Sequence, residues 1–217
     1  MAVERTIHSP LATFYKWEKA QTDRLYLRQP INGVWQNYTW GECGDQVRRM
    51  AAYLKSLNYP PGSRIAILSK NCVHWMLSDF AIWMAGYVSV PMYPNMSPNT
   101  VRQILEHSES KMLFVGKLDD WSYLKPGIPE TLPCVAYPFY GITEYKNWDE
   151  IIKNNAPVKE NLDYPIQNLC TIMYTSGTTG VPKGVMHTFY NFAFAAEYAF
   201  PELKVDNTAV FFSYLPM

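Results

Sequence analysis

Short apolar segments alternate with helical patterns between residues 64 and 115, and no other feature constrains the fold as strongly. Arg64–Leu68, Val88–Pro91 and Met112–Val115 have the length and composition of buried strands. Helical patterns connect them, from Asn71, an N-cap candidate, to Gly86 and from Ser97 to Ser108. Strands that alternate with helices favour a mostly parallel sheet flanked by helices. We therefore expect an α/β fold.

The segments on either side of this alternation carry their own turn and cap signals. Asn32-Gly33 separates two strand-like runs and predicts a hairpin. Thr39 follows as an N-cap candidate for the next helix. Residues 116–165 are rich in proline and predict surface connections, and Leu169–Tyr174 is again a compact apolar strand.

Composition and charge exclude several classes of protein. Apolar residues make up 48% of the chain and charged residues 18%, which indicates a globular fold. Lys+Arg and Asp+Glu both number 19, so the net charge of zero argues against nucleic-acid and polybasic membrane binding. No apolar run is long enough for a signal peptide or a membrane span. The four cysteines are widely spaced, which favours reduced thiols in a cytoplasm over a metal site.

One segment carries the chemistry of the sequence. Directly after the strand at Leu169–Tyr174, residues 175–184 read Thr-Ser-Gly-Thr-Thr-Gly-Val-Pro-Lys-Gly. Glycines let successive backbone N–H groups point into one concavity, while hydroxyls and an ammonium add further donors to an anion. The composition suits a polyphosphate. Taken alone, it is equally typical of a flexible turn between two strands.

Three better-known motifs do not fit this segment. A Walker A loop requires Gly before the lysine and Ser or Thr after it, whereas Pro182 and Gly184 flank Lys183. The dinucleotide pattern G-x-G-x-x-G is missing from the segment. Ser176 does not lie in the G-x-S-x-G elbow of hydrolases.

The whole string from Thr175 to Gly184 resembles the signature phosphate loop of the AMP-forming adenylating enzymes, which include acyl-CoA synthetases, adenylation domains and firefly luciferase. Other segments resemble the same family, namely Tyr38-Thr39-Trp40, Pro61–Ile67 and Val90–Pro94. Together they look most like bacterial long-chain fatty acyl-CoA synthetases. The resemblance extends across nearly the whole chain.

The resemblance implies a reaction and a set of ligands. In that family a carboxylate attacks the α-phosphate of Mg-ATP, which gives an acyl-adenylate and pyrophosphate, and a thiol then displaces AMP. The substrates would be a fatty acid, ATP and coenzyme A, with Mg²⁺ as the metal. The β- and γ-phosphates would be held by Thr175, Ser176, Gly177, Thr178, Thr179, Gly180 and Lys183. A cytoplasmic location is expected, with peripheral contact at the inner membrane face.

The resemblance also implies how much of the family this chain contains. Residues 1–217 would form the N-terminal portion of the AMP-binding domain, with a first α/β part at 1–165 and the start of the phosphate-loop subdomain at 166–217. Relatives continue well beyond this point, and Leu215-Pro216-Met217 resembles the start of a further motif. We therefore expect an N-terminal fragment without the C-terminal domain, without a complete set of catalytic residues and inactive alone. Its exposed apolar surface could drive self-association.

Two other functions remain open. One is a ligase for an aryl or other carboxylic acid, or for transfer to a carrier-protein thiol. The other is a short, non-catalytic module that binds a nucleotide or a partner. Near the loop, His187 is expected to be structural, and the aromatic residues between Phe189 and Tyr198 are expected to pack in the core. Trp75 and Trp83 are expected to pack from one helix.

Overall fold

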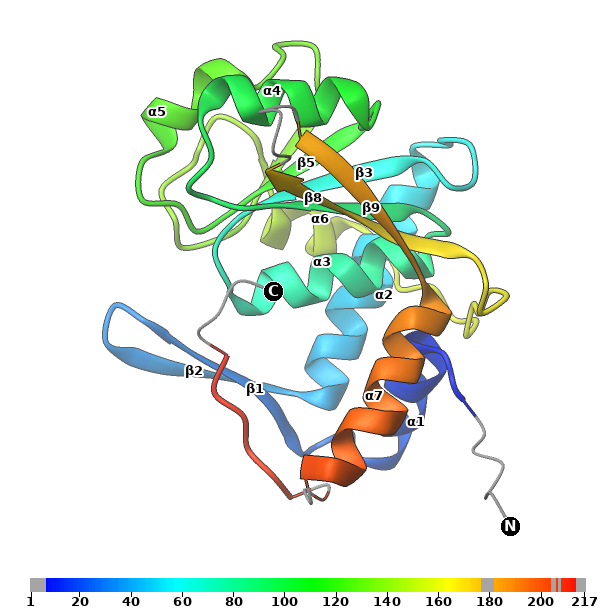
Figure 1. The fold of residues 1–217 in the computed structure, drawn as a ribbon. Helices are drawn as coiled ribbons and strands as arrows, with labels where there is room; N and C mark the ends of the chain where they lie inside the picture. The colour runs from blue at the N-terminus through cyan, green and yellow to red at the C-terminus, as the bar shows by residue number, and fades with distance from the viewer. Residues whose placement is uncertain (1–6, 177–181, 204–205, 207, 214–217) are drawn as a thin grey trace.

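The chain folds around a seven-stranded sheet with helices on both of its faces (Figure 1). The computed structural model describes residues 7–176, 182–203, 206 and 208–213. In chain order the elements are α1 (Pro10–Ala20), β1 (Leu25–Ile31), β2 (Val34–Thr39), α2 (Trp40–Ser56), β3 (Arg64–Leu68), α3 (Val73–Met84), β4 (Val88–Met92), α4 (Pro98–His107), β5 (Met112–Val115), α5 (Trp121–Leu124), the 3₁₀ turn η1 (Lys125–Gly127), β6 (Cys134–Ala136), β7 (Lys146–Asn147), α6 (Trp148–Asn154), β8 (Leu169–Ser176), β9 (Pro182–Thr188) and α7 (Phe189–Leu203).

The order of strands in the sheet confirms the predicted α/β class. The strands lie in the order β7-β6-β5-β3-β4-β8-β9, and all neighbours run parallel except β8 and β9. β8 and β9 join the same sheet as the earlier strands, and the predicted division of the chain after residue 165 stays a prediction.

Side chains of successive strand residues enter two different hydrophobic clusters. Ile65 and Ile67 pack with α2, α3 and α6 on one face, whereas Ala66 and Leu68 pack with α4 on the other. The two-residue period of a strand explains this division, since neighbouring side chains point to opposite faces. Figure 1 shows α4 and α5 on one side of the sheet and α2, α3 and α6 on the other. Among the helices of the described residues, none combines the length and apolarity needed to cross a membrane.

The hairpin formed by β1 and β2 is a separate two-stranded sheet. Asn32 and Gly33 adopt φ of 49° and 79° at its turn, as the Asn-Gly signal predicts. Tyr26 of β1 stacks on Trp40 at the start of α2, with ring centroids 3.6 Å apart. This contact fastens the hairpin to the helical layer.

The helix caps confirm one prediction and correct another. Thr39 and Glu42 form a capping box at the start of α2. Asn71 is not the N-cap of α3, because that position is taken by Cys72, whose side chain makes no cap hydrogen bond. Instead, the backbone N–H of Val73 donates to Oε1 of Gln29 at 2.6 Å. The hairpin therefore caps a helix 44 residues further along the chain.

Arg48 of α2 fixes the irregular connection that leads into β8. Its guanidinium bonds both carboxylate oxygens of Glu18 on α1, at 2.7 and 2.8 Å. It also donates to the carbonyls of Val158 and Glu160 and to Oδ1 of Asn161. One side chain thus joins two helices to a connection with no regular structure of its own.

Candidate functional site

The segment with phosphate-loop composition lies at the tip of an antiparallel hairpin made by β8 and β9. The predicted strand at Leu169–Tyr174 extends to Ser176, and β9 returns from Pro182. In the register of this pair Thr175 lies opposite Lys183 and Ser176 opposite Pro182. β9 was not predicted from the sequence, because its proline, glycine and polar residues lack the alternation typical of a strand.

The structure brings together three of the seven predicted phosphate-binding residues. Thr175 and Lys183 face each other across the hairpin, and both are exposed. Ser176 ends β8 at the same tip. The other four, Gly177, Thr178, Thr179 and Gly180, lie outside the described residues. The hairpin therefore places a hydroxyl residue and an ammonium at the two ends of the predicted loop.

Next to its tip, this hairpin is held by a tyrosine and a glycine. Tyr174 is buried, and its hydroxyl hydrogen-bonds Nδ1 of His107, at the end of α4, at 2.7 Å. A Cβ added to Gly184 would lie 2.7 Å from Cγ2 of Ile172 and 3.2 Å from Cζ of Tyr174. Only glycine therefore allows β9 to approach β8 this closely. Burial raises the pKa of Tyr174, against the opposing charge of Arg64, so the phenol keeps its proton at neutral pH.

The partnership between His107 and Tyr174 was missed from the sequence. His107 precedes Tyr174 by 67 residues. Its position in the last turn of a helix carries no signal for a partner on a distant strand. Only the placement of α4 beside the β8–β9 hairpin brings the two side chains together.

The other end of β8 is fixed to the parallel sheet by buried polar contacts. Ser89 on β4 donates to Oγ1 of Thr171 at 3.0 Å, and both residues are buried. The indole N–H of Trp83 donates to the carbonyl of Cys170 at 2.8 Å. The predicted packing role of Trp83 is confirmed, because its side chain is buried and satisfied. The hairpin thus stands on a rigid base.

The residues around His187, where β9 leads into α7, make structural contacts. Its half-buried ring lies 6.0 Å from Phe192, and its carbonyl accepts from the thiol of Cys170. Thr188 donates its backbone N–H and its hydroxyl to Oδ1 of Asn191 at the start of α7. The expectation that all the aromatic residues of this segment pack in the core is wrong for two of them. Phe189 is buried, but Phe194 and Tyr198 on α7 are 42% and 49% exposed.

The described part of the hairpin is suited to an anion and not to a metal. Lys183 adds a positive charge beside the hydroxyl of Thr175, and neither described strand segment contains a carboxylate. Across the described residues, no group of three or more His, Cys, Asp or Glu side chains could hold a metal ion. A polyphosphate matches this donor set better than any cation does.

Comparison with known proteins gives a consistent result. The family model described as "AMP-binding enzyme" matches residues 14–217. The probable CoA ligase CCL6 of Humulus lupulus is 30% identical over 220 residues, which cover 89% of this chain and 32% of that protein. The long-chain-fatty-acid–CoA ligase FadD15 of Mycobacterium tuberculosis is 31% identical over 187 residues, which cover 83% and 31%.

A solved structure shows the same fold. The benzoate CoA ligase of Burkholderia xenovorans LB400 superposes with a TM-score of 0.74 at 19% identity, over 91% of this chain and 38% of that one. The chain spans about a third of the length of the relatives that it matches.

Proposed function

Because this chain belongs to the AMP-binding enzyme family, we propose that it forms the phosphate-binding part of an ATP-dependent ligase. The ligase would activate a carboxylic acid as an acyl-adenylate and transfer the acyl group to coenzyme A, with release of pyrophosphate and AMP. The observation that carries this proposal is the β8–β9 hairpin, which places Thr175 opposite Lys183 at the two ends of the signature loop.

In this proposal the loop holds the phosphates that leave as pyrophosphate. Lys183 would neutralise charge on the β- and γ-phosphates, while the hydroxyls of Thr175 and Ser176 donate hydrogen bonds to their oxygens. Gly177, Thr178, Thr179 and Gly180 would supply backbone N–H groups and further hydroxyls. Such a loop acts by positioning and charge stabilisation, since phosphoryl and adenylyl transfer need little covalent chemistry from the protein.

Mg²⁺ would reach this site on the phosphates of ATP. The described residues at the hairpin offer no carboxylate for it, so they do not form a metal site and we assign the ion no step. Coenzyme A would act as the acceptor thiol in the second half of the reaction.

We propose a long-chain fatty acid as the carboxylic acid. The support is the named activity of relatives such as the mycobacterial long-chain-fatty-acid–CoA ligase. A cytoplasmic site with peripheral contact at the inner membrane face would suit this substrate, because a long acyl chain gains about 0.8 kcal/mol per methylene buried in lipid. Acid-dependent exchange between ATP and pyrophosphate by the complete gene product, run across fatty, aryl and amino acids, tests the choice. Failure to exchange with any fatty acid would exclude it.

ATP binding by the isolated chain tests the role of the hairpin directly. Titration with ATP, followed by NMR of the protein amides, is expected to show weak binding with shifts confined to the β8–β9 tip. Lys183→Ala should weaken this binding tenfold or more, because a charge-assisted hydrogen bond contributes about 1.5–3 kcal/mol. Lys159→Ala, which removes an exposed lysine from the connection before β8, is the matched control. Equal binding by the Lys183 variant and the parent chain would contradict the proposed role.

A further inference from the structure

One tyrosine ring contacts both strands of the β8–β9 hairpin. Tyr174 belongs to β8 and lies opposite Gly184 of β9. Its ring extends over Gly184, since a Cβ added there would lie 3.2 Å from Cζ and 3.5 Å from Cε1 of the ring. Tyr174 directly precedes Thr175, and Gly184 directly follows Lys183. The ring therefore joins the two strands one position away from two of the predicted phosphate-binding residues.

The hydroxyl of Tyr174 links the hairpin to α4, which lies beside the hairpin in Figure 1. It is 2.7 Å from Nδ1 of His107, and the two rings meet edge to face with their centroids 5.7 Å apart. The tyrosine ring also packs in the hydrophobic cluster that contains Val101, Ile104 and Leu105 of α4. The contact is thus both polar and apolar.

This link is the main polar support of the hairpin near its tip. Among the described residues from 172 to 186, no other side chain hydrogen-bonds a residue outside the hairpin. Thr175, Lys183 and Gly184 are exposed. The contacts of Ser89 and Trp83 hold the opposite end of β8. The tip therefore depends on Tyr174 for its position.

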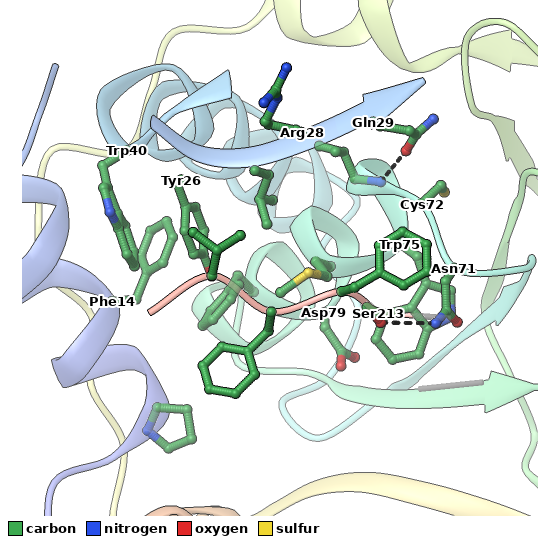
Figure 2. Close-up of a pocket in the computed structure, with 18 of the residues that line it drawn as sticks. Phe14, Tyr26, Arg28, Gln29, Trp40, Asn71, Cys72, Trp75, Asp79 and Ser213 are labelled. Carbon is green, nitrogen blue, oxygen red and sulfur yellow. Dashed lines mark hydrogen bonds between the residues drawn. The ribbon is translucent and has the colours of Figure 1, made fainter. Parts of the chain in front are cut away.

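The large cleft of the molecule does not supply a second support for the tip. It opens between the β1–β2 hairpin and α3, and Figure 2 shows Tyr26 and Trp75 around it. Among the described residues that line this cleft, none belongs to β8, β9 or α4. The tip is therefore supported from α4, and a change in the side chain of His107 does not alter the lining of the cleft.

The end of α4 is itself fixed to the parallel sheet. Arg64 of β3 donates through Nε to the carbonyl of Ser108 at 2.6 Å and forms an ion pair with Glu109 at 2.6 Å. The backbone N–H of Lys111 donates to the carbonyl of Arg64. Ser108 directly follows His107, so β3 holds the end of the helix next to the histidine. His107 thus connects the hairpin to a fixed part of the fold.

The support and the predicted phosphate-binding groups lie on different faces of the hairpin. Neighbouring residues of a strand point to opposite faces, so Thr175 points away from the face on which Tyr174 meets α4. Lys183 lies opposite Thr175 in the register and shares its face. An effect of His107 on these two residues would therefore pass through Tyr174.

We propose that His107 is a positioning residue for phosphate binding and acts through Tyr174. Its hydrogen bond holds the phenol ring over Gly184, and the ring holds both strands so that Thr175 and Lys183 meet the same phosphates. A donor contributes fully to binding only when its position is fixed beforehand. This inference rests on the proposed function, which assigns Thr175 and Lys183 to the phosphates of ATP.

The affinity for ATP, measured by NMR titration of the purified chain, tests this role. His107→Ala should weaken ATP binding about fivefold, the effect expected for loss of one neutral hydrogen bond. Tyr174→Phe keeps the ring and loses the hydroxyl, so it should weaken binding about as much. The double variant should bind no more weakly than either single variant, because both changes remove the same link. His107→Asn should restore most of the affinity, because its amide lies where Nδ1 lies in histidine.

The control is Gln103→Ala, at an exposed residue of the same helix, which should bind ATP as the parent chain does. Circular dichroism and urea unfolding check that each variant is folded at the conditions of the titration. A merely structural hydrogen bond would lower the stability and leave the ATP affinity of the folded chain unchanged, and that result would overturn the inference. Additive losses in the double variant, or no recovery in His107→Asn, would also overturn it.

Hydrogen exchange of the backbone amides without ATP separates this inference from the proposed function. His107→Ala should speed exchange at residues 172–176 and 182–186 about fivefold and leave exchange in α3 unchanged. A parent chain without ATP-dependent shifts would refute the proposed function. Faster exchange at the hairpin would then still support its link to His107, and unchanged exchange would overturn that link.

Discussion

Replacing His74 with phenylalanine should remove a specific acid sensitivity from the fold. His74 lies on α3 and is only 2% exposed. Its ring packs among aromatic rings, 5.4 Å from Trp148 and 5.6 Å from Tyr137. Its Nδ1 has no hydrogen-bond partner among the described residues. Burial therefore lowers the pKa of His74 from 6.5 to about 4.

The size of the effect follows from linkage between protonation and folding. Between pH 6.5 and pH 4 the unfolded chain binds a proton at His74 that the folded chain does not bind. Stability therefore falls as the pH is lowered through this range. A difference of about 2.5 pKa units corresponds to a loss of about 3 kcal/mol at pH 4 relative to pH 7. This is a large part of the total stability of an ordinary domain.

Urea unfolding at a series of pH values from 4 to 7.5, followed by circular dichroism, measures the effect. The difference in unfolding free energy between the parent chain and His74→Phe should change by about 3 kcal/mol over this range, in favour of the variant at low pH. The other titrating groups are the same in both proteins, so their contributions cancel in this difference. The packing cost of the larger phenylalanine ring does not depend on pH, so it does not change how the difference varies with pH. His8→Gln, at an exposed histidine, should follow the parent chain. Two parallel curves for the parent and His74→Phe would refute the reasoning.

Two further predictions concern contacts that join distant elements. Arg48→Ala should lower the free energy of unfolding, measured in urea, by about 2 kcal/mol, because it leaves Glu18 and three groups of the connection before β8 without their donor. The control Arg102→Ala loses one exposed contact with a carbonyl and should cost less than about 0.5 kcal/mol. Equal losses in the two variants would contradict the role of Arg48. Gln29→Ala should cost about 1 kcal/mol or more by leaving the N–H of Val73 unpaired. Tyr140→Phe, which removes only the hydroxyl that accepts from the Gln29 amide, should cost less, and an equal loss in both variants would argue against capping.

The parallel core could be predicted because its signals are local. Each of the strands β3, β4 and β5 is a short apolar run, and the helices between them have their own periodicity and caps. The hairpin turn at Asn32-Gly33 and the capping box at Thr39 likewise depend on neighbours in the sequence. In each case the residues that determine the structure lie within a few positions of it.

The features that could not be predicted depend on contacts between distant segments. Gln29 replaces Asn71 as the side-chain partner of the α3 N-terminus because tertiary packing brings the hairpin there. β9 forms although its sequence is poor for a strand, because β8 supplies a neighbour and Gly184 permits close approach. Phe194 and Tyr198 fit a core pattern, yet they are exposed because nothing in the described part of the chain covers that side of α7.

Only part of the candidate site could be predicted, because the rest depends on contacts between distant segments. The string from Thr175 to Gly184 is contiguous, so the sequence alone identifies it. The support from His107, Ser89 and Trp83 comes from three elements that the string does not contain.

The link between Ser89 and Thr171 has a consequence for the order in which the chain folds. These residues are 82 positions apart, and they form the paired position that joins β8 to β4. The β8–β9 hairpin is local and can form within microseconds, but closing so long a loop carries a larger entropic cost and must follow assembly of the parallel strands. We therefore expect the β8–β9 hairpin, which carries the candidate site, to acquire its fixed position last, on a sheet that is already built.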